Sequence, residues 1–277
     1  MRHSGSNTPR HASARRPPRR KRFGQHFLHD PSIIDRIAAA IHPQPDEHLV
    51  EIGPGRGALT RRLLGKGSLD AIEIDRDLVE LLTREFTGQS GFSLHPADAL
   101  EFNFTELAHS RGGKLRVIGN LPYNISTPLL FHLLDHRAAI HDLHIMLQRE
   151  VITRMAAKAG DPDYGRLTVM LAPWVTVEHL FDVGPGAFTP PPRVWSAVAR
   201  LSVRPEPAFP VSEHFGEVVA AAFAHRRKTI RNALRDLVTL EQIEATGLDP
   251  GARPETFPPE AFNVLAQKIV RSVQATD

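Results

Sequence analysis

A glycine-rich turn between a buried strand and a helix is the feature that most restricts the fold of this chain. Residues 48–52 form a short apolar run typical of a buried strand, residues 53–57 form the turn, and residues 58–64 favour a helix. Glycine at Gly53 and Gly55 lets the backbone turn sharply and approach a ligand closely. This arrangement is typical of the first strand and helix of an open, mostly parallel sheet.

Strand and helix patterns alternate on both sides of this turn. Asp30 and Pro31 favour a helix start, because an acidic cap precedes proline at the first helical position, and apolar residues recur at helical spacing up to residue 41. Further strands are predicted at 69–74, 92–95, 115–118 and 143–147, and further helices at 77–86 and 127–134. The alternation predicts an α/β fold, with a mostly parallel sheet covered by helices on both faces.

The pattern changes in the last part of the chain. Residues 167–180 and 194–203 are predicted to be strands that flank a proline-rich loop at 188–192. After residue 210 the pattern favours helices at 214–224, 228–238, 241–245 and 259–273. We therefore expect a basic arm at 1–21, an α/β domain at 22–205 and a small helical domain at 206–277.

Basic residues are concentrated before Asp30. No acidic residue precedes it, and the remaining chain has 26 Lys and Arg against 31 Asp and Glu, so the folded body is slightly acidic although the net charge is +3. We expect a disordered arm that contacts nucleic acid through phosphates. A solubilising tail and an organelle transit peptide are the alternatives. The basic residues are Arg2, Arg10, Arg15, Arg16, Arg19, Arg20, Lys21 and Arg22.

The composition excludes several classes of site. The chain has no cysteine, which excludes disulfides, thiolate metal sites and cysteine nucleophiles. No stretch approaches the roughly 20 apolar residues that a membrane span needs, so we expect no membrane partner. The histidines show no metal-ligand spacing, so we predict no metal. We expect a monomeric protein in a reducing cytoplasm.

Polar side chains follow the predicted strands where parallel strands end at one edge of the sheet. Glu73 lies 20 positions after Gly53 at the end of the second strand, where a carboxylate accepts hydrogen bonds from ribose hydroxyls. Asp98 and Asn120 follow the next two strands. These residues predict a nucleotide-containing cofactor at this edge. The glycine spacing also fits a dinucleotide fingerprint, so this region does not decide between a nicotinamide cofactor and S-adenosylmethionine.

The segment Asn120-Leu121-Pro122-Tyr123 points to methylation of an adenine amino group. That nitrogen is a poor nucleophile because its lone pair is delocalised into the ring. If the Asn120 amide oxygen and the Leu121 carbonyl accept its two hydrogens, the nitrogen becomes pyramidal and its lone pair can face a methyl donor. Pro122 stiffens the loop, and Tyr123 offers a ring on which an extruded base can stack. The alternative is a proline-containing turn in which Asn120 is a local cap.

Seven segments resemble one family, the ribosomal RNA adenine N6,N6-dimethyltransferases, and in particular its bacterial small-subunit (16S) members. They are residues 22–28, 51–55, 119–130, 147–151, 164–167, 188–194 and 226–232. The resemblance runs from about residue 22 to the C-terminal helices. It implies a Rossmann-like class I methyltransferase fold with seven strands, the last antiparallel, and a helical C-terminal domain.

The resemblance also implies S-adenosylmethionine as the cofactor, with contacts at His26, Leu28, Gly53, Glu73, Asp98 and Asn120, in addition to the turn at Gly55. His26 stands where the family usually has asparagine, and imidazole can donate or accept a hydrogen bond as the amide does, so we expect the contact to be retained. The substrate implied is 16S rRNA in an assembling 30S particle. Two adjacent adenines near the 3′ end would each receive two methyl groups.

Two elements are predicted to contact RNA. Phe188 precedes three prolines and would stack on the face of the flipped base opposite Tyr123; the alternative is a core phenylalanine. A helix from Arg226 to Arg235 would carry a basic ridge on one side and an apolar stripe of Ile230, Leu234, Leu237 and Val238 on the other, suited to contacting phosphates. An ordinary solvated face is the alternative. The basic residues are Arg226, Arg227, Lys228, Arg231 and Arg235.

Three rival functions stay open. The first is the large-subunit adenine dimethylases of macrolide resistance, against which Leu121 and residues 164–167 favour the small-subunit members. The second is a non-catalytic RNA-binding assembly factor with the same fold, against which the intact segment from Asn120 to Tyr123 argues. The third is a nicotinamide dehydrogenase, for which no catalytic dyad is found.

Overall fold

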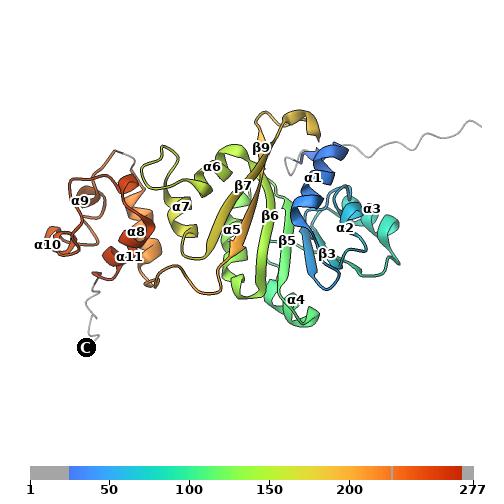
Figure 1. Cartoon of the computed structure of the whole chain (residues 1–277), viewed down its shortest axis with the longest axis horizontal. Coiled ribbons are helices and arrows are strands. Elements are labelled where there is room, and N and C mark those ends of the chain that lie inside the picture. The colour runs from blue at the N-terminus through green and yellow to red at the C-terminus, as the bar shows by residue number, and fades with distance from the viewer. Residues whose placement is uncertain (1–24, 226, 270–277) are drawn as a thin grey trace, which may run out of the picture.

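The computed structural model describes residues 25–225 and 227–269, and its centre is a seven-stranded sheet (Figure 1). The strand order is β4-β3-β2-β5-β6-β9-β7. β9 is antiparallel to both of its neighbours, and the other pairings are parallel. The predicted sheet, including its antiparallel last strand, is confirmed. The strands are β2 (His48–Ile52), β3 (Ser68–Glu73), β4 (Phe92–Pro96), β5 (Leu115–Asn120), β6 (Ile140–Gln148), β7 (Val175–Val183) and β9 (Ser196–Val203).

Helices connect the strands, and a separate two-stranded ribbon joins distant parts of the chain. The ribbon pairs β1 (Phe27–Leu28) with β8 (Phe188–Thr189) in antiparallel fashion. The predicted helix start at Pro31 is confirmed, because the Asp30 carboxylate accepts from the backbone N–H of Ser32 at 2.9 Å. The helices are α1 (Pro31–Ile41), α2 (Thr60–Leu63), α3 (Arg76–Phe86), α4 (Phe104–Arg111), α5 (Ser126–Asp135), α6 (Arg149–Ala156) and α7 (Arg166–Leu171).

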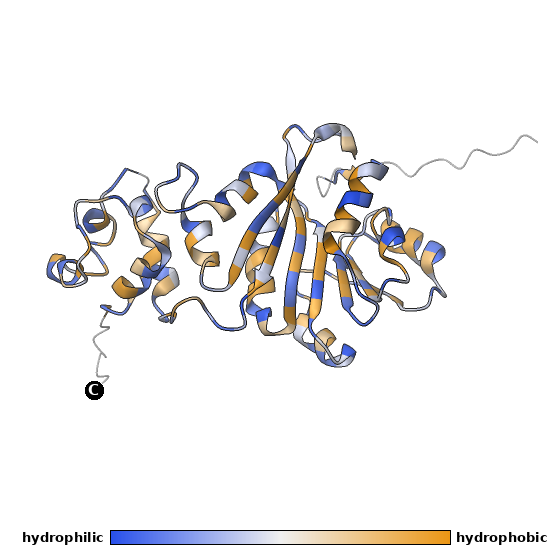
Figure 2. Ribbon diagram, in the orientation of Figure 1, coloured by the Kyte–Doolittle hydropathy of each residue, from blue (hydrophilic) through white to orange (hydrophobic). Residues whose placement is uncertain are grey.

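Apolar side chains bury both faces of the sheet. On one face, α4 and α5 pack through residues such as Phe104 and Leu133 against the strands. On the other face, α1 and α2 pack through residues such as Ile37 and Leu63. Figure 2 shows the matching two-sided character of α1, which carries both hydrophobic and hydrophilic residues. The sheet is therefore the middle layer of three.

Four helices at one end of the molecule form a further apolar cluster (Figure 1). They are α8 (Phe215–Ala222), α9 (Ile230–Ala233), α10 (Leu240–Glu244) and α11 (Pro259–Ala266). Tyr164 and Val169 pack into the same cluster from the segment around α7. The domain boundary at 205/206 stays a prediction, and the arm at 1–21 lies outside the described residues. Among the helices within residues 25–225 and 227–269, none combines the length and the apolar composition that a membrane span requires.

Three predicted elements differ from the structure. The strand predicted at 167–180 is wrong in its first part, where α7 forms before β7 begins at Val175; an apolar run of this length suits a buried helix as well as a strand. The helix predicted at 228–238 is also wrong, because only Ile230–Ala233 are helical. The helix predicted at 259–273 ends at Ala266 within the described residues, and residues 270–273 lie outside them.

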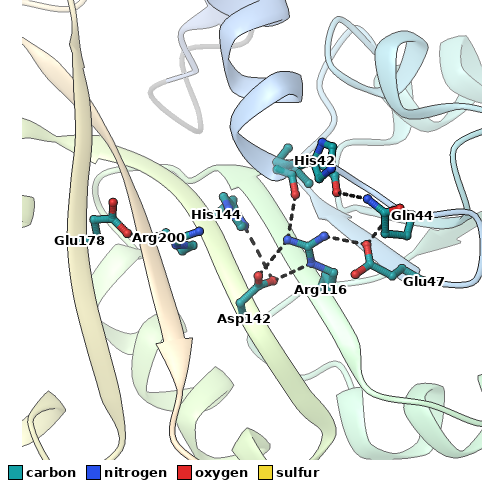
Figure 3. Close-up of polar contacts among 9 residues, drawn as sticks. His42, Gln44, Glu47, Arg116, Asp142, His144, Glu178 and Arg200 are labelled. Atoms are coloured by element: carbon teal, nitrogen blue, oxygen red, sulfur yellow. Dashed lines mark hydrogen bonds and ion pairs between the residues drawn. The ribbon is translucent and has the colours of Figure 1, made fainter.

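A buried ionic cluster ties α1 to the central strands (Figure 3). The Arg116 guanidinium on β5 donates to both carboxylate oxygens of Asp142 on β6, to Glu47 at 2.6 Å and to the carbonyl of Ile41 at 2.8 Å. Burial alone would raise the pKa of Asp142, but His144 and Arg116 beside it outweigh burial and lower the pKa to about 2. The charged cluster thereby fixes the C-terminal end of α1 near the start of β5, whereas Asn120 lies at the other end of that strand.

Candidate active site

A cavity of about 360 Å³ lies where β2, β3, β4 and β5 end. Parallel α/β sheets bind ligands at this edge. Ten of the residues predicted for the cofactor and for the chemistry line this one cavity. They are His26, Leu28, Gly53, Gly55, Glu73, Asp98, Asn120, Leu121, Pro122 and Tyr123.

The glycine turn after β2 forms one wall of the cavity. Gly55 has φ +59°, in the left-handed region that favours glycine. A Cβ atom built on it would lie 3.1 Å from the ring of Phe27, which also lines the cavity. Gly119 is needed for a different reason, because a Cβ there would lie 2.8 Å from the carbonyl oxygen of Ile52 on the adjacent strand. Both glycines keep the backbone close to its neighbours at the cavity wall.

Glu73 at the end of β3 presents a carboxylate held by the backbone. One oxygen accepts from the N–H of Asp75 at 3.0 Å and the other from the N–H of Gly55 at 3.3 Å. Burial raises the pKa of Glu73, and these two backbone N–H groups oppose that rise. The adjacent Ile74 is 48% exposed and lines the cavity. A carboxylate beside an exposed apolar side chain suits a ribose with its attached base.

Asn120, the last residue of β5, has its side-chain amide fixed by a segment distant in sequence. Its Nδ2 donates to the carbonyl oxygen of His26 at 3.0 Å. Because the amide nitrogen is engaged there, Oδ1 is the acceptor on the other side of the amide, and no described residue donates to it. The backbone N–H of Leu121 donates to the carbonyl of Met146 at 3.1 Å, which holds the following peptide. Asn120 Oδ1 is therefore oriented before any ligand binds.

Tyr123 lines the same cavity and is held at its hydroxyl end. Its hydroxyl lies 2.6 Å from Ser196 Oγ at the start of β9. Its ring is 6.0 Å from the His26 imidazole, centroid to centroid. Burial raises the pKa of Tyr123, so the phenol stays neutral at physiological pH. Neither Ser196 nor the His26 carbonyl was found from sequence, because the contacts join segments 73 and 94 residues apart.

The structure does not bring Phe188 to the cavity, which corrects its predicted position. Phe188 is 2% exposed and belongs to the apolar cluster beneath α1 and α2. It sits in β8, paired with Leu28 of β1. Phe188 is therefore a core phenylalanine, the alternative interpretation of the sequence. The pairing of β8 with β1 places its ring in the protein interior.

The predicted basic ridge is likewise not a continuous helix. Arg231 lies in the short helix α9, Arg227 precedes it, and Arg235 follows it in a turn, while Arg226 lies outside the described residues. Arg227, Arg231 and Arg235 are exposed, and Lys228 is half-buried. The apolar side of the prediction is correct for Ile230, Leu234 and Val238, which are buried. Arg235 lies 3.5 Å from the carboxylate of Asp236, which offsets part of its charge.

Glu51 is a cavity-lining carboxyl that the sequence did not single out. It is 3% exposed on β2, and its Oε2 accepts from the hydroxyl of Thr60 at 2.6 Å. Burial raises its pKa to about 7, with the nearby Glu73 adding to the rise and Thr60 opposing it. An acid inside an apolar strand was the signal available in the sequence.

The raised pKa of Glu51 makes a prediction about stability. As pH rises from 4.5 to 7, the unfolded chain loses this proton while the folded protein keeps it, so the free energy of unfolding falls by up to about 3 kcal/mol. Glu51→Gln keeps an acceptor for Thr60 and cannot ionise, so its stability relative to wild type should increase over this pH range. Thermal unfolding from pH 4 to 9 measures this. Parallel pH profiles of the two proteins would contradict the assignment.

The residues around the cavity fit a nucleoside-containing methyl donor better than a metal. Backbone glycines, an oriented carboxylate, an apolar side chain and an amide oxygen match the hydroxyls, base and amino groups of such a molecule, and the cavity volume lies in the range usual for small-ligand sites. Within the described residues, no group of three or more His, Cys, Asp or Glu side chains is arranged to hold a metal ion.

Comparison with known proteins then decides the family. Residues 18–269 match the family model described as ribosomal RNA adenine dimethylase. The chain belongs to this family. It is thus an S-adenosylmethionine-dependent rRNA adenine dimethyltransferase. The segment from Asn120 to Tyr123 predicted methylation of an adenine amino group, and the family resemblance implied the rRNA substrate and the dimethylation. The nicotinamide dehydrogenase alternative is excluded.

Individual relatives agree with the family match. The chain is 54% identical to the ribosomal RNA small subunit methyltransferase A of Pseudomonas aeruginosa, covering 90% of this chain and 94% of the relative. It is 52% identical to the protein of the same name from Hahella chejuensis, covering 90% and 92%. Among solved structures, the 23S rRNA methyltransferase ErmE is 28% identical with a TM-score of 0.68, covering 88% of this chain and 99% of that one. A dimethyladenosine transferase from Plasmodium falciparum, 24% identical with a TM-score of 0.72 and covering 87% and 96%, shares the fold.

Proposed function

We propose that this enzyme dimethylates N6 of two adjacent adenines near the 3′ end of 16S rRNA, acting as a cytoplasmic monomer on the 30S particle during its maturation. The observation that carries the choice of subunit is the 54% identity, along 90% of the chain, to a relative named as a small-subunit rRNA methyltransferase. ErmE, named for 23S rRNA, is only 28% identical. This difference favours the small-subunit target over the large-subunit alternative.

The side chains around the cavity would act mainly by positioning. When bound, S-adenosylmethionine supplies a methyl group on a positively charged sulfur. Asn120 Oδ1 and the Leu121 carbonyl would accept the two hydrogens of the adenine amino group, which favours a lone pair directed at that methyl group. The bond from Asn120 Nδ2 to the His26 carbonyl keeps the amide from rotating. A monomethylated amine retains one hydrogen, so the second transfer would use only one of these acceptors.

Tyr123 is the aromatic side chain best placed to stack on the target base. Its hydroxyl is anchored to Ser196, so the ring is held at one end while its side chain lines the cavity. Stacking on a held ring compensates for the unstacking that base extrusion requires. With Phe188 in the core, Tyr123 alone carries this role in our proposal.

Glu73 is the residue we propose to bind the ribose hydroxyls. Glu73→Ala should weaken S-adenosylmethionine binding by about 1.5–3 kcal/mol, as expected for loss of hydrogen bonds to a charged group. Isothermal titration calorimetry measures the affinity directly. Asp77→Ala, an exposed acid on the adjoining helix α3, is the matched control and should leave the affinity unchanged. Equal affinity for Glu73→Ala and wild type would remove Glu73 from the cofactor site.

Methyl transfer to 30S particles that lack the modification tests the function as a whole. Base-resolution mapping should find the methyl groups on two adjacent adenines near the 3′ end of 16S rRNA. Methylation of 23S rRNA instead would favour the large-subunit alternative. A folded protein that binds S-adenosylmethionine and the particle without transferring methyl groups would favour a non-catalytic assembly factor.

A further inference from the structure

A short exposed segment at the start of β9 combines an aromatic, an apolar and a basic side chain. Trp195 is 50% exposed and Val194 is 44% exposed, and Arg193 before them is also exposed. Large apolar side chains at a protein surface mark interaction sites when they lie next to one another. Ile74, another exposed apolar side chain, already belongs to the cavity wall. Trp195 and Val194 are not explained by the cavity, which they do not line.

The indole of Trp195 has neighbours on the protein side, although the residue is 50% exposed. The Arg149 backbone N–H donates to the Trp195 carbonyl at 2.9 Å, and the Arg149 guanidinium lies 5.8 Å from the indole centroid. On another side, the ring lies close to Gly184, where an added Cβ would be 3.7 Å from two of its carbon atoms. A ring that is held in this way can stack on a partner at little further entropic cost.

The position of Trp195 links it to the proposed catalytic residues. The next residue, Ser196, holds the hydroxyl of Tyr123 at 2.6 Å. Trp195 is therefore bonded directly to Ser196, the residue that holds Tyr123, and Tyr123 is the ring on which the target adenine would stack. Trp195 is thus one residue away from the contact that holds Tyr123 at the cavity.

Two arginines beside Trp195 favour nucleic acid as its partner. Arg149 has a 53% exposed side chain, and it lies 3.4 Å from Asp182, which offsets part of its charge. Arg193 forms no ion pair with any described residue. Exposed tryptophan flanked by arginine is the combination that stacks on unpaired bases while neutralising the adjacent phosphates. We propose that Trp195 stacks on an unpaired nucleotide next to the target adenine and so positions the strand outside the cavity. This inference rests on the proposed RNA substrate.

Fluorescence of the indole tests the contact directly. The chain has two tryptophans, and the other, Trp174, is partly buried against the core with the Arg137 guanidinium 4.0 Å from its ring centroid. In Trp174→Phe, Trp195 is the only emitter, and its emission should be quenched by unmodified 30S particles and by protein-free 16S rRNA. In Trp195→Phe, where Trp174 alone emits, the quenching should be absent. Quenching by the particle, but not by protein-free RNA at concentrations at which the RNA is bound to the enzyme, would assign the surface to a ribosomal protein and overturn the proposal.

Kinetics then separate positioning from chemistry. Trp195→Ala should raise the KM for the particle roughly 5- to 140-fold, the range expected when one base–aromatic stack is removed, while kcat and S-adenosylmethionine affinity stay near wild type. Trp195→Phe should recover most of the loss, and Val264→Ala, which removes apolar surface from an exposed position on α11, should resemble wild type. A Trp195→Ala enzyme with an unchanged KM would overturn the inference. Wild-type activity on the same particles tests the proposed function separately, so failure of one is distinguishable from failure of the other.

Discussion

Replacing Asn120 with alanine should lower the turnover of methyl transfer about 100-fold or more while the protein stays folded and binds S-adenosylmethionine. The expected loss is that of one preorganised group acting on the transition state. Alanine removes the Oδ1 acceptor and also the 3.0 Å hydrogen bond to the His26 carbonyl. Turnover is measured at saturating cofactor and 30S particles, with thermal unfolding and calorimetry on the same preparations.

A second substitution at the same position tests whether the amide donor is needed in addition to the Oδ1 acceptor. Asn120→Asp keeps an oxygen acceptor but loses the donor, and its carboxylate would be repelled by the His26 carbonyl that the amide now contacts. We therefore expect Asn120→Asp to lose activity as well, because an acceptor is useful only when it is correctly oriented. Near-normal turnover in either folded variant would contradict the proposed role of Asn120.

The edge of the sheet that carries the cavity was predictable because its geometry follows from strand spacing. In a parallel sheet, residues that follow successive strands meet at one edge, so Gly53, Glu73, Asp98 and Asn120 could be placed together from their positions alone. The structure brings these four residues to one cavity. The helix start at Asp30 was also predictable, because a capping side chain bonds to backbone groups only two or three residues away.

The contacts that orient the site depend on pairings between distant segments, and these left no local signal. The β1–β8 ribbon, the bond from Asn120 to His26 and the contact of Tyr123 with Ser196 all join residues far apart in sequence. Strand pairing also explains why Phe188 was misplaced: the proline-rich loop suggested an exposed ring, whereas the pairing of β8 buries it. The strand predicted at 167–180 was wrong for a different reason. Helix α7 contributes apolar residues to two separate clusters, so its sequence lacks the single apolar face by which a helix is recognised.

Reversing the charges of Arg227 and Arg231 together should abolish methylation of the particle while S-adenosylmethionine binding persists. Both side chains are exposed beside the buried Ile230, so their replacement by glutamate leaves the apolar cluster of the C-terminal helices intact. Although the structure shows no long basic helix, the two charges stay on an ordered surface, which can match a specific arrangement of phosphates. For every phosphate that the variant no longer neutralises, the magnitude of the log-affinity against log-salt slope should fall by about 0.7–0.9.

The matched control is Arg62→Glu with Arg84→Glu, which changes the net charge equally on exposed positions of α2 and α3. α3 lies at the opposite end of the molecule from α9 (Figure 1), so this control should reduce methylation far less. Deleting residues 1–20, which contain basic but no acidic residues and lie outside both the described residues and the family resemblance, should flatten the salt dependence of binding and leave the choice of adenine unchanged. Normal methylation by the Arg227 and Arg231 double variant, or a changed set of adenines after truncation, would contradict this division of roles between the C-terminal surface and the arm.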